Sequence, residues 1–554
     1  MKKKLFFLLQ SIALCMCLNA QISTNQNPKS FSLDNLNLNT VNTVQLTPPD
    51  MREIDSVDAE RDAMFKMQAC GVRIPVDKDF FDYATVIPLQ DADLYLLRVT
   101  SQYALALNLY CDDFFMPEGT QLHVYNPMHT RCLGAFTDRN NSSDGYFATD
   151  YVYNDTMVIE YYCPKNVTDR AKIHIQSIGY FYRDVQYEDG TDVKAGLNTS
   201  GPCNVNINCS EGDNYRDVQR SVVKLMIPIN AYQIGYCTGT ILNNTQEDKK
   251  PYVITAAHCI QDVTNQSYYS QIVVVFNYET QGCSRSKQEP KVQSLTGCNV
   301  LAYDKSFSQN GGDYLFVELK ENIPEDYNPY FCGWTTTHDK APSAVCIHHP
   351  SGDVKKISVS TQQIKETQIS SPDEGWDPNT HWTATWSATD NGYGITEGGS
   401  SGSGLFNPQG MLIGVLSGGA SSCYTQDKYK VDWFGKFYVA YDSIKQWLDP
   451  ANTGAEELNG NSFTASLTET LSKDNNDFTL YPVPAEDYII INASENINNA
   501  VVTVFDINGR KHLTMQCNIM SYGFKINLPS LPAGTYYINV KSQHFNKTQS
   551  FTVR

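Results

Sequence analysis

Hydrophobic and polar positions alternate over short distances along most of this chain, which is the pattern of β-strands rather than of helices. Segments 93–99, 121–125 and 157–162 are short, aromatic and β-branched, and turn signals separate them. They predict an all-β domain, a sandwich, over residues 70–187. Residues 21–69 are polar, rich in Asn and Asp and without periodic apolar positions, so we expect a partly disordered leader there.

Two polar stretches divide the rest of the chain. Residues 188–201 contain glycine and predict a domain boundary, and residues 456–474 read as a linker. Between them, residues 195–455 form one block of short strands that closes in an amphipathic helix over 443–448, stopped by Asp449-Pro450. After the linker, residues 475–554 predict a small β-sandwich with a hairpin turn at Asn508-Gly509.

The first 20 residues have the pattern of a secretory signal peptide. Lys2, Lys3 and Lys4 precede an apolar run from Leu5 to Leu18, and Ala20 is the expected cleavage site. No later run is long and apolar enough to span a bilayer. Export permits disulfides, and 16 cysteines are available in the whole chain, two of them inside the signal.

Length and charge narrow the possible functions. With 554 residues we expect several domains. The formal net charge of −18 argues against nucleic acid as a general partner, because phosphate binding needs clustered Lys and Arg. The 34 tyrosines and 24 phenylalanines suit β-structure.

Three stretches of the central block carry candidate chemistry. They are residues 255–259 (TAAHC), 312–317 (GDYLFV) and 398–404 (GGSSGSG). Taken singly, a Gly/Ser run is usually a flexible loop, a lone histidine is usually structural, and a strand-start aspartate is usually solvated. Together they occur in the order His, Asp, Ser, which is the chymotrypsin order of the serine triad.

The three stretches predict a division of roles. Asp313 would hold the tautomer of His258 that accepts the proton of Ser401, the nucleophile. The backbone N–H groups of Gly399 and Ser401 would form the oxyanion hole. A bridge from Cys237 to Cys259 would pin the histidine loop and stabilise the fold by roughly 3 kcal/mol under the chain-entropy model.

Six motifs, in order, resemble the lysyl endopeptidases, a bacterial branch of the chymotrypsin-like serine proteases. They are residues 203–209, 255–259, 346–350, 399–403, 418–423 and 447–450. The resemblance implies a double β-barrel with the triad in the cleft between the barrels. It also implies the disulfides Cys203–Cys423 and Cys209–Cys283 beside Cys237–Cys259. One pair among Cys298, Cys332 and Cys346 stays possible.

The same resemblance addresses substrate choice. Trypsin-like enzymes carry the acid of the specificity pocket six residues before the nucleophile, where this chain has Ile395. Lysyl endopeptidases point instead to Asp432, whose carboxylate would pair with a lysine ammonium. The alternative is that Asp432 has no role in substrate binding and is a surface aspartate ahead of the last strand. Ser417, Gly418 and Gly419 are the further expected substrate-binding residues.

The chain departs from its relatives at two positions. Lysyl endopeptidases have histidine where this chain has Ser417. Serine is usual at this position in the wider chymotrypsin family, where it supports the triad aspartate. The resemblance also implies a tryptophan, for which Trp376 is the candidate, in an accessory arrangement that stacks on the catalytic histidine. Without the histidine at position 417, that arrangement would be incomplete. Ser400 stands where digestive proteases have the aspartate that captures the new N-terminus, so activation must proceed differently.

The last 75 residues or so resemble the type A sorting domain of type IX secretion. The matching residues are 481–484, 504–510, 531–536 and 551–554. The resemblance implies a secretion-machinery partner, passage through the outer membrane, removal of the domain, and release or attachment at the cell surface.

The leading hypothesis is a secreted serine endopeptidase that cleaves protein substrates after lysine. Residues 21–194 would be a prosegment trimmed at Lys194 by the enzyme itself, and Lys473 offers a second site in the other linker. We expect a monomer when mature. We expect no cofactor and no metal, because His348-His349 lacks further ligands at metal spacing.

Two other functions are consistent with the sequence. One is a trypsin-like protease of broader Lys/Arg specificity. The other is a catalytically inactive surface adhesin that uses the protease fold as a scaffold. A sugar-binding role for residues 70–187 would not exclude any of these.

Overall fold

The computed structural model describes residues 27–553 with internal gaps. Not described are residues 34–35, 63–67, 184–196, 261–263, 287, 289, 306–311, 367–379, 463–477, 482, 494–496, 507–509, 521–523 and 543–545. The signal cleavage site at Ala20 and the two linker lysines, Lys194 and Lys473, fall outside the described residues. The chain divides into two compact units, Met1–Thr464 and Ala465–Arg554.

The N-terminal part of the first unit is a β-sandwich, as the alternating pattern predicted. One sheet contains β1 (Thr43–Leu46), β3 (Thr85–Pro88), β4 (Ala92–Ser101), β6 (Gln121–Tyr125), β7 (Cys132–Phe136) and β10 (Thr156–Pro164). The other contains β2 (Gln68–Asp79), β5 (Ala106–Phe115), β8 (Phe147–Ala148), β9 (Val152–Tyr153) and β11 (Lys172–Phe181). Alternate residues of the two sheets, such as Leu97, Leu109 and Ile159, form the shared core.

The expected disordered leader is ordered where the structure describes it. Two short helices, η1 (Lys29–Ser32) and η2 (Leu38–Thr40), lead into β1, which pairs in parallel with β4. The buried Glu160 carboxylate accepts from the backbone N–H groups of Lys29 and Ser30. In residues 27–33 and 36–46 the order comes from backbone hydrogen bonds to a sheet edge and to Glu160. It also comes from apolar packing, because Phe31, Leu36 and Leu38 lie against the buried cluster that contains Val41. Parts of the leader, residues 21–26, 34–35 and 63–67, lie outside the described residues. Helix α1 (Met51–Asp62) follows.

The central block forms a near-closed barrel followed by a half-barrel, which confirms the predicted all-β architecture. The first barrel contains β13 (Val222–Pro228), β14 (Gln233–Leu242), β15 (Tyr252–Thr255), β16 (Val273–Val275), β17 (Ser294–Thr296), β18 (Cys298–Asp304) and β19 (Tyr314–Leu319). These strands pair in the order β17-β16-β13-β14-β15-β19-β18. Short helices α3 (Arg216–Gln219) and α4 (Gln266–Ser270) lie between strands.

The second sheet of the block follows the first along the chain. Its main path is β12 (Val205–Asn206), β22 (Lys356–Ser360), β21 (Ala344–His348), β25 (Gly404–Phe406), β26 (Leu412–Gly419), β27 (Val431–Lys436), β24 (His381–Thr385) and β23 (Lys365–Glu366). Strands β20 (Trp334–Thr335) and β28 (Glu457–Leu458) attach to its side.

The predicted closing helix, α5 (Phe437–Leu448), begins six residues earlier than expected and ends at Leu448, with Asp449 as its C-cap. Its buried residues Phe437, Ala440, Ile444 and Leu448 recur at helical spacing and join the core shared by both sheets of the block.

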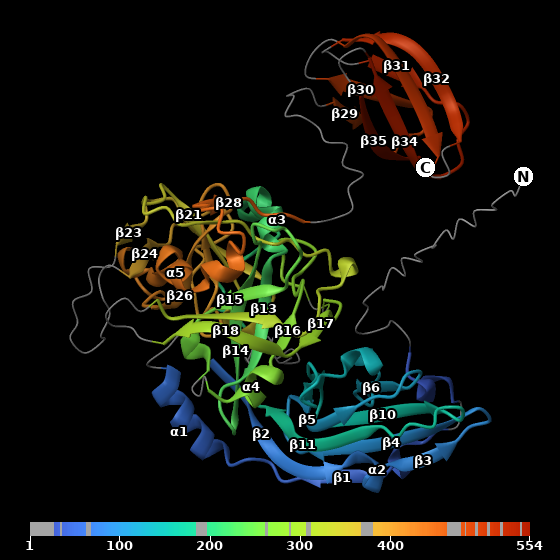
Figure 1. The fold of residues 1–554 in the computed structure, drawn as a ribbon, viewed down its shortest axis with the longest axis vertical. Coiled ribbons are helices and arrows are strands. Elements are labelled where there is room, and N and C mark those ends of the chain that lie inside the picture. The colour runs from blue at the N-terminus through green and yellow to red at the C-terminus, as the bar shows by residue number, and fades with distance from the viewer. Residues whose placement is uncertain are drawn as a thin grey trace, which may run out of the picture. The chain divides into compact units, whose positions relative to one another are not determined.

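The sandwich and the first barrel share one continuous sheet, which the sequence did not predict. Strand β2 pairs antiparallel with β14, with Val72 opposite Gln233 and Gly71 opposite Ile234 (Figure 1). Residues from both sides fill one buried cluster, among them Tyr110, Tyr151 and Phe181 from the sandwich and Ile234, Tyr236 and Tyr278 from the barrel. The sandwich and the first barrel are therefore parts of one packed unit, and most of the predicted boundary, residues 188–196, lies outside the described residues.

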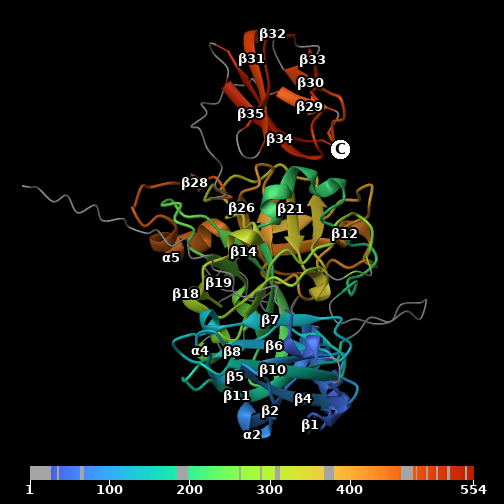
Figure 2. The same ribbon diagram turned by 90° about the vertical axis from the view of Figure 1, so that its right-hand side faces the viewer.

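The second unit is a small two-sheet β-domain (Figure 2). One sheet orders β29 (Phe478–Tyr481), β30 (Tyr488–Ala493) and β33 (Phe524–Asn527). The other orders β32 (Lys511–Ile519), β31 (Ile497–Asp506), β34 (Gly534–Lys541) and β35 (Asn546–Val553). β31 and β32 pair antiparallel, as the hairpin prediction requires, although the turn itself lies outside the described residues.

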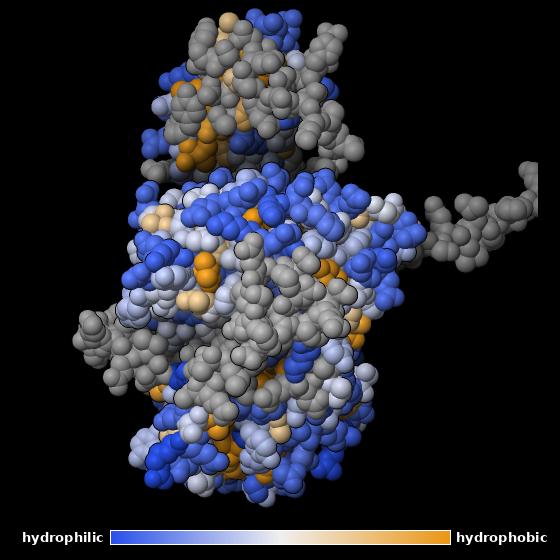
Figure 3. Space-filling model, turned by 90° about the vertical axis from the view of Figure 1, so that its left-hand side faces the viewer, coloured by the Kyte–Doolittle hydropathy of each residue, from blue (hydrophilic) through white to orange (hydrophobic). Residues whose placement is uncertain are grey.

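On the face drawn in Figure 3, described residues are mainly hydrophilic, with hydrophobic ones in small groups. Within the described parts of the chain, no helix combines the length and apolar character needed to cross a membrane.

Candidate active site

The predicted base and its orienting acid meet at the end of two paired strands of the first barrel. β15 leads into the turn Ala257–Cys259, and β19 begins directly after Asp313. Nδ1 of His258 lies 2.7 Å from Oδ2 of Asp313, and the backbone N–H of His258 donates to Oδ1 at 3.0 Å. Asp313 is fully buried and has a φ of 44°, a conformation that costs a non-glycine residue free energy. Both carboxylate oxygens are thereby aimed at His258.

The predicted nucleophile comes from the second sheet, in the loop before β25. Oγ of Ser401 lies 2.8 Å from Nε2 of His258, although the two residues are 143 positions apart. The loop needs glycine on both sides of the serine. A Cβ at Gly399 (φ 89°) would lie 2.9 Å from the carbonyl oxygen of His349, and one at Gly402 (φ 82°) would lie 2.5 Å from that of Thr238.

Thr238 on β14 fastens the nucleophile loop to the first barrel. Its hydroxyl donates to the carbonyl of Gly399 at 3.0 Å, and its backbone N–H donates to the carbonyl of Ser401 at 2.8 Å. The hydroxyl also accepts from the N–H of His349. These bonds direct the loop carbonyls toward β14. Among the described residues, the N–H groups of Gly399 and Ser401 have no acceptor. They are available for a developing oxyanion.

Three disulfides tie the segments of the site together. They are Cys203–Cys423, Cys209–Cys283 and Cys237–Cys259, the pairs that the resemblance implied. The last one joins β14 to the turn that carries His258. Cys298, Cys332 and Cys346 are all buried free thiols, and no pair forms among them.

The predicted specificity acid, Asp432, is fully buried on β27. Its Oδ2 accepts hydrogen bonds from the Trp386 indole, the Thr396 hydroxyl and the Ser421 hydroxyl, at 2.5, 2.7 and 2.5 Å. The surface-aspartate alternative is therefore excluded. Neither Trp386 nor Thr396 was singled out from the sequence, although Thr396 directly follows Ile395.

The end of β26 carries the other expected substrate-binding residues. A β-bulge falls between Leu416 and Gly418, and Gly419 lies opposite Asp432 in the ladder. A Cβ at Gly419 would lie 1.8 Å from Oδ1 of Asp432, so no larger residue fits there.

The expected contact of Ser417 with the triad aspartate is replaced by another. Within the described residues, the Ser417 hydroxyl pairs with Nε2 of His381 at 3.2 Å, while both oxygens of Asp313 face His258. His381 comes from the neighbouring part of the sheet on β24 and was not predicted as a site residue. The proposed stacking residue Trp376 lies outside the described residues.

The His348-His349 pair has structural partners. His348 bridges the hydroxyls of Ser400 and Ser358, at 2.7 and 3.1 Å. Nδ1 of His349 lies 2.9 Å from the carbonyl of Asp353, and burial, aided by nearby Lys355, holds the pKa of His349 well below its ordinary value. No group of three or more metal-ligating side chains gathers in the described part of the chain.

Two regions of the chain match known protein families. Residues 197–435 match the family model described as "Lysyl endopeptidase, C-terminal domain". This stretch of the chain is therefore similar to the lysyl endopeptidase family. Residues 479–554 match the "Secretion system C-terminal sorting domain", which implies secretion or attachment at the cell surface.

The individual proteins that this chain resembles are distant from it in sequence. A lysyl endopeptidase from Pseudomonas aeruginosa is 30% identical over 320 residues, covering 54% of this chain and 62% of that protein. The chain thus spans less than two thirds of this relative's length. A crystal structure of an inactive mutant of Rv3671c from M. tuberculosis H37Rv is 14% identical and covers 46% of this chain and 97% of the other. Its TM-score of 0.28 is too low to support a structural argument.

Proposed function

We propose that the central block is a serine endopeptidase that cleaves peptide bonds on the carboxyl side of lysine. The observation that carries the proposal is the position of His258, whose two ring nitrogens lie within hydrogen-bond distance of Asp313 and Ser401. That arrangement supports acyl transfer through a serine nucleophile.

In the proposed reaction, the side chains of the triad and the two backbone N–H groups act in a fixed order. As the Ser401 oxygen attacks the substrate carbonyl, its proton passes to Nε2 of His258. Asp313 keeps the other proton on Nδ1 and stabilises the imidazolium that forms. The N–H groups of Gly399 and Ser401 then stabilise the oxyanion, each donor lowering the barrier by roughly 3–4 kcal/mol. His258 returns its proton to the leaving amine, and water hydrolyses the acyl-enzyme by the same steps.

Asp432 is the proposed floor of the specificity pocket. Its Oδ2 already accepts three hydrogen bonds, and its Oδ1 accepts from the backbone N–H of Ser421 at 3.2 Å. A guanidinium prefers two parallel bonds to both oxygens of a carboxylate, whereas an ammonium binds as a point charge. The occupied oxygen therefore favours lysine over arginine, which sets this proposal apart from a broader Lys/Arg protease.

The sandwich is the proposed prosegment. It adds β2 to the sheet that contains β14, the strand whose Thr238 holds the nucleophile loop. We propose that it assists or silences the protease domain through this strand.

The test is fluorophosphonate labelling and peptide-library digestion by the processed protein, with Ser401→Ala as the control. We expect labelling of Ser401 and cleavage after lysine, both absent from the control. Cleavage after arginine as well would move the specificity determinant away from Asp432. No labelling and no cleavage by processed protein would favour the inactive surface adhesin.

A further inference from the structure

Residues 198–204, which include the end of the predicted boundary stretch, are held beside the nucleophile loop by two carboxylates. We call residues 198–204 the strap. Asp353, which is fully buried, accepts from the backbone N–H groups of Asn198 and Ser200, at 2.6 and 3.3 Å, and from the Ser200 hydroxyl at 2.6 Å. The carboxylate also forms a buried ion pair with Lys356. The negative charge of Asp353 is therefore balanced by Lys356 and by hydrogen bonds, so it does not need the α-ammonium of a new N-terminus as its partner.

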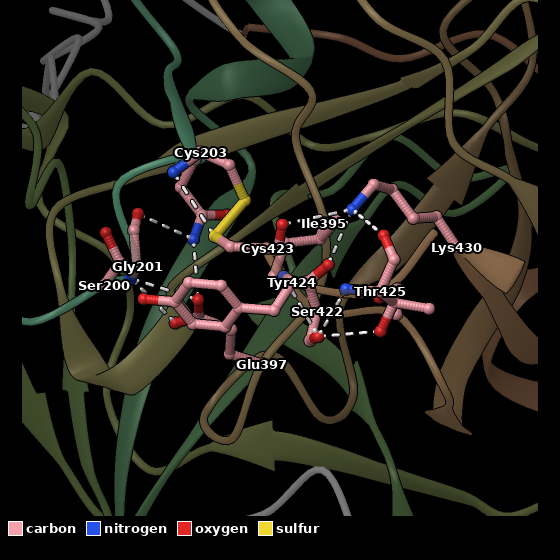
Figure 4. The surroundings of a disulfide bond; sticks show 12 residues. Ser200, Gly201, Cys203, Ile395, Glu397, Ser422, Cys423, Tyr424, Thr425 and Lys430 are labelled. Carbon is pink, nitrogen blue, oxygen red and sulfur yellow. Dashed lines mark hydrogen bonds between the residues drawn. A yellow bond between two sulfur atoms is a disulfide. The ribbon is translucent and has the colours of Figure 1, made fainter. Parts of the chain in front are cut away.

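The second carboxylate belongs to the nucleophile loop itself. Both oxygens of Glu397 accept from the N–H of Gly201, at 3.0 and 3.2 Å (Figure 4). Oε1 also accepts from the Asn204 amide at 3.0 Å. The approach is close, since a Cβ on Gly201 would lie 2.5 Å from Oε1. The Cys203–Cys423 disulfide holds the same stretch of the strap (Figure 4).

The segments that carry the two carboxylates are hydrogen-bonded, through backbone groups, to the residues before the nucleophile. The carbonyl of Glu397 accepts from the N–H of Ser400, and the N–H of Glu397 donates to the Ser400 hydroxyl. In the turn that ends at Asp353, the N–H of Ser351 donates to the carbonyl of Gly398 at 2.5 Å. The peptide groups on either side of Gly399 are thus positioned by the strap and its two acids.

We propose that Glu397, supported by Asp353, is a positioning residue that holds the oxyanion loop through backbone N–H groups of the strap. The proposal rests on the proposed function. In this arrangement the strap does the work that a new α-ammonium does in digestive proteases. Because backbone N–H groups neither titrate nor depend on chain cleavage, the loop geometry is independent of the new N-terminus. Cutting the linker then serves to free the enzyme from its prosegment.

The experiment compares two variants with two matched controls in the processed protein. Glu397→Gln removes the charge. Gly201→Ala would place a Cβ 2.5 Å from Oε1 of Glu397 and 2.8 Å from Sγ of Cys423, which forces the strap away from both. The controls are Glu325→Gln, in an exposed ion pair with Lys249, and Gly282→Ala, where an added Cβ meets nothing within 4 Å. We expect kcat to fall about 10- to 100-fold in the two variants, with KM within about threefold, because a displacement of ~1 Å can cost ~100-fold. We expect both controls to behave as wild type.

A second measurement does not depend on how the variants fold. Cyanate at neutral pH carbamylates α-amines before lysine side chains, because the α-amine has the lower pKa. We expect the processed wild-type enzyme, blocked at its N-terminus as verified by mass spectrometry, to keep its kcat.

The possible outcomes separate the two proposals. Loss of activity on blocking, or wild-type kcat in both strap variants, would overturn the role of the strap while leaving the protease intact. Absence of fluorophosphonate labelling in wild type would overturn the proposed function itself.

Discussion

The side chains proposed for catalysis and specificity are held by hydrogen bonds to residues far away in the sequence. His258 lies 55 positions from Asp313 and 143 from Ser401, and Asp432 lies 46 from Trp386. Each bond can therefore be removed by one isosteric substitution without altering the local chain.

Asp432→Asn is expected to lower kcat/KM for lysine substrates by about 30-fold to several thousand-fold, because removing one partner of a desolvated charge pair costs roughly 2–5 kcal/mol. Steady-state kinetics on matched lysine and norleucine peptides would measure this. Asp427→Asn, at an exposed position near the same strand, is the control. Unchanged selectivity for lysine in the Asp432 variant would point to another acid.

Thr238→Val tests the bond that fastens the nucleophile loop to β14. The substitution leaves the buried carbonyl of Gly399 without its donor, which costs about 1–3 kcal/mol. We expect a lower Tm and a kcat reduced about tenfold. Thr240→Val on the same strand is a matched control, since among the described residues its buried hydroxyl has no hydrogen-bond partner. Equal effects of the two substitutions would contradict the role of Thr238.

At the level of elements, the main finding is the addition of β2 to the edge of β14. The pairing spans Gln233–Tyr236, immediately before Cys237 and Thr238. Strand β14 therefore pairs with the sandwich through the residues just before Cys237, which forms the disulfide to the turn that carries His258. Release of the sandwich would require that pairing to be broken.

Self-processing at Lys194 is the corresponding prediction. If the enzyme trims its own linker, the mature wild-type chain begins at Ala195, and Ser401→Ala protein expressed alone stays uncut. N-terminal sequencing and intact-mass measurement of both proteins would check this. A start far from Ala195, or normal trimming of the Ser401→Ala protein, would show that another protease does the work.

In the whole molecule, the sandwich and the protease domain also meet through charges. Asp144 of the sandwich accepts from Ser270 at 2.6 Å and forms an ion pair with Lys320 at 2.5 Å. The buried Lys224 ammonium of β13 lies over the rings of Tyr278 and Tyr236 and over that of Tyr151 from the sandwich. The interface thus combines a strand pairing, an apolar cluster and ionic contacts.

Acid is expected to weaken this interface. Burial acts to raise the pKa of Asp144, but hydrogen bonds from Lys320, Ser270 and Ser142 outweigh it and lower the pKa to about 2, from an ordinary 3.8. A carboxyl whose pKa is depressed on docking favours docking above its ordinary pKa, and the contribution is lost as pH falls toward the depressed value. After linker cleavage, the two fragments should co-elute at pH 7 and separate progressively below about pH 4.

The control for the acid experiment is a change elsewhere in the sandwich. Asp144→Asn should weaken docking at pH 7 and flatten its dependence on pH. Asp113→Asn, in an exposed pair with Lys172, should do neither. Identical pH profiles for wild type and Asp144→Asn would assign the acid effect to other groups.

The sorting domain is a separate compact unit with its own core, which includes Val502, Val504 and Ile538. Deleting residues 465–554 should therefore block export while leaving the Tm of the first unit within a few degrees of its value in the full chain. Cell fractionation and thermal melting would measure the two effects. A large fall in Tm would mean that the units stabilise each other.

The strand-rich character of the chain and the order of the His, Asp and Ser stretches could be predicted from local pattern, because alternation has a period of two residues and each motif depends on the chemistry of a few neighbours. The candidate specificity acid, Asp432, came instead from the resemblance to lysyl endopeptidases. The helix at 443–448 was found from its local pattern, and its start was missed because Phe437 and Ala440 are buried against the distant core shared by both sheets of the block.

Tertiary structure alone decided which distant groups meet. The pairing of β2 with β14, of Ser417 with His381 and of Gly201 with Glu397 joins residues that have no local signal for one another. The entropy of closing such loops changes only slowly with their length, so spacing does not select the partner. Burial selects the partner, because a polar group that is removed from water must form a hydrogen bond with a group that the fold brings next to it.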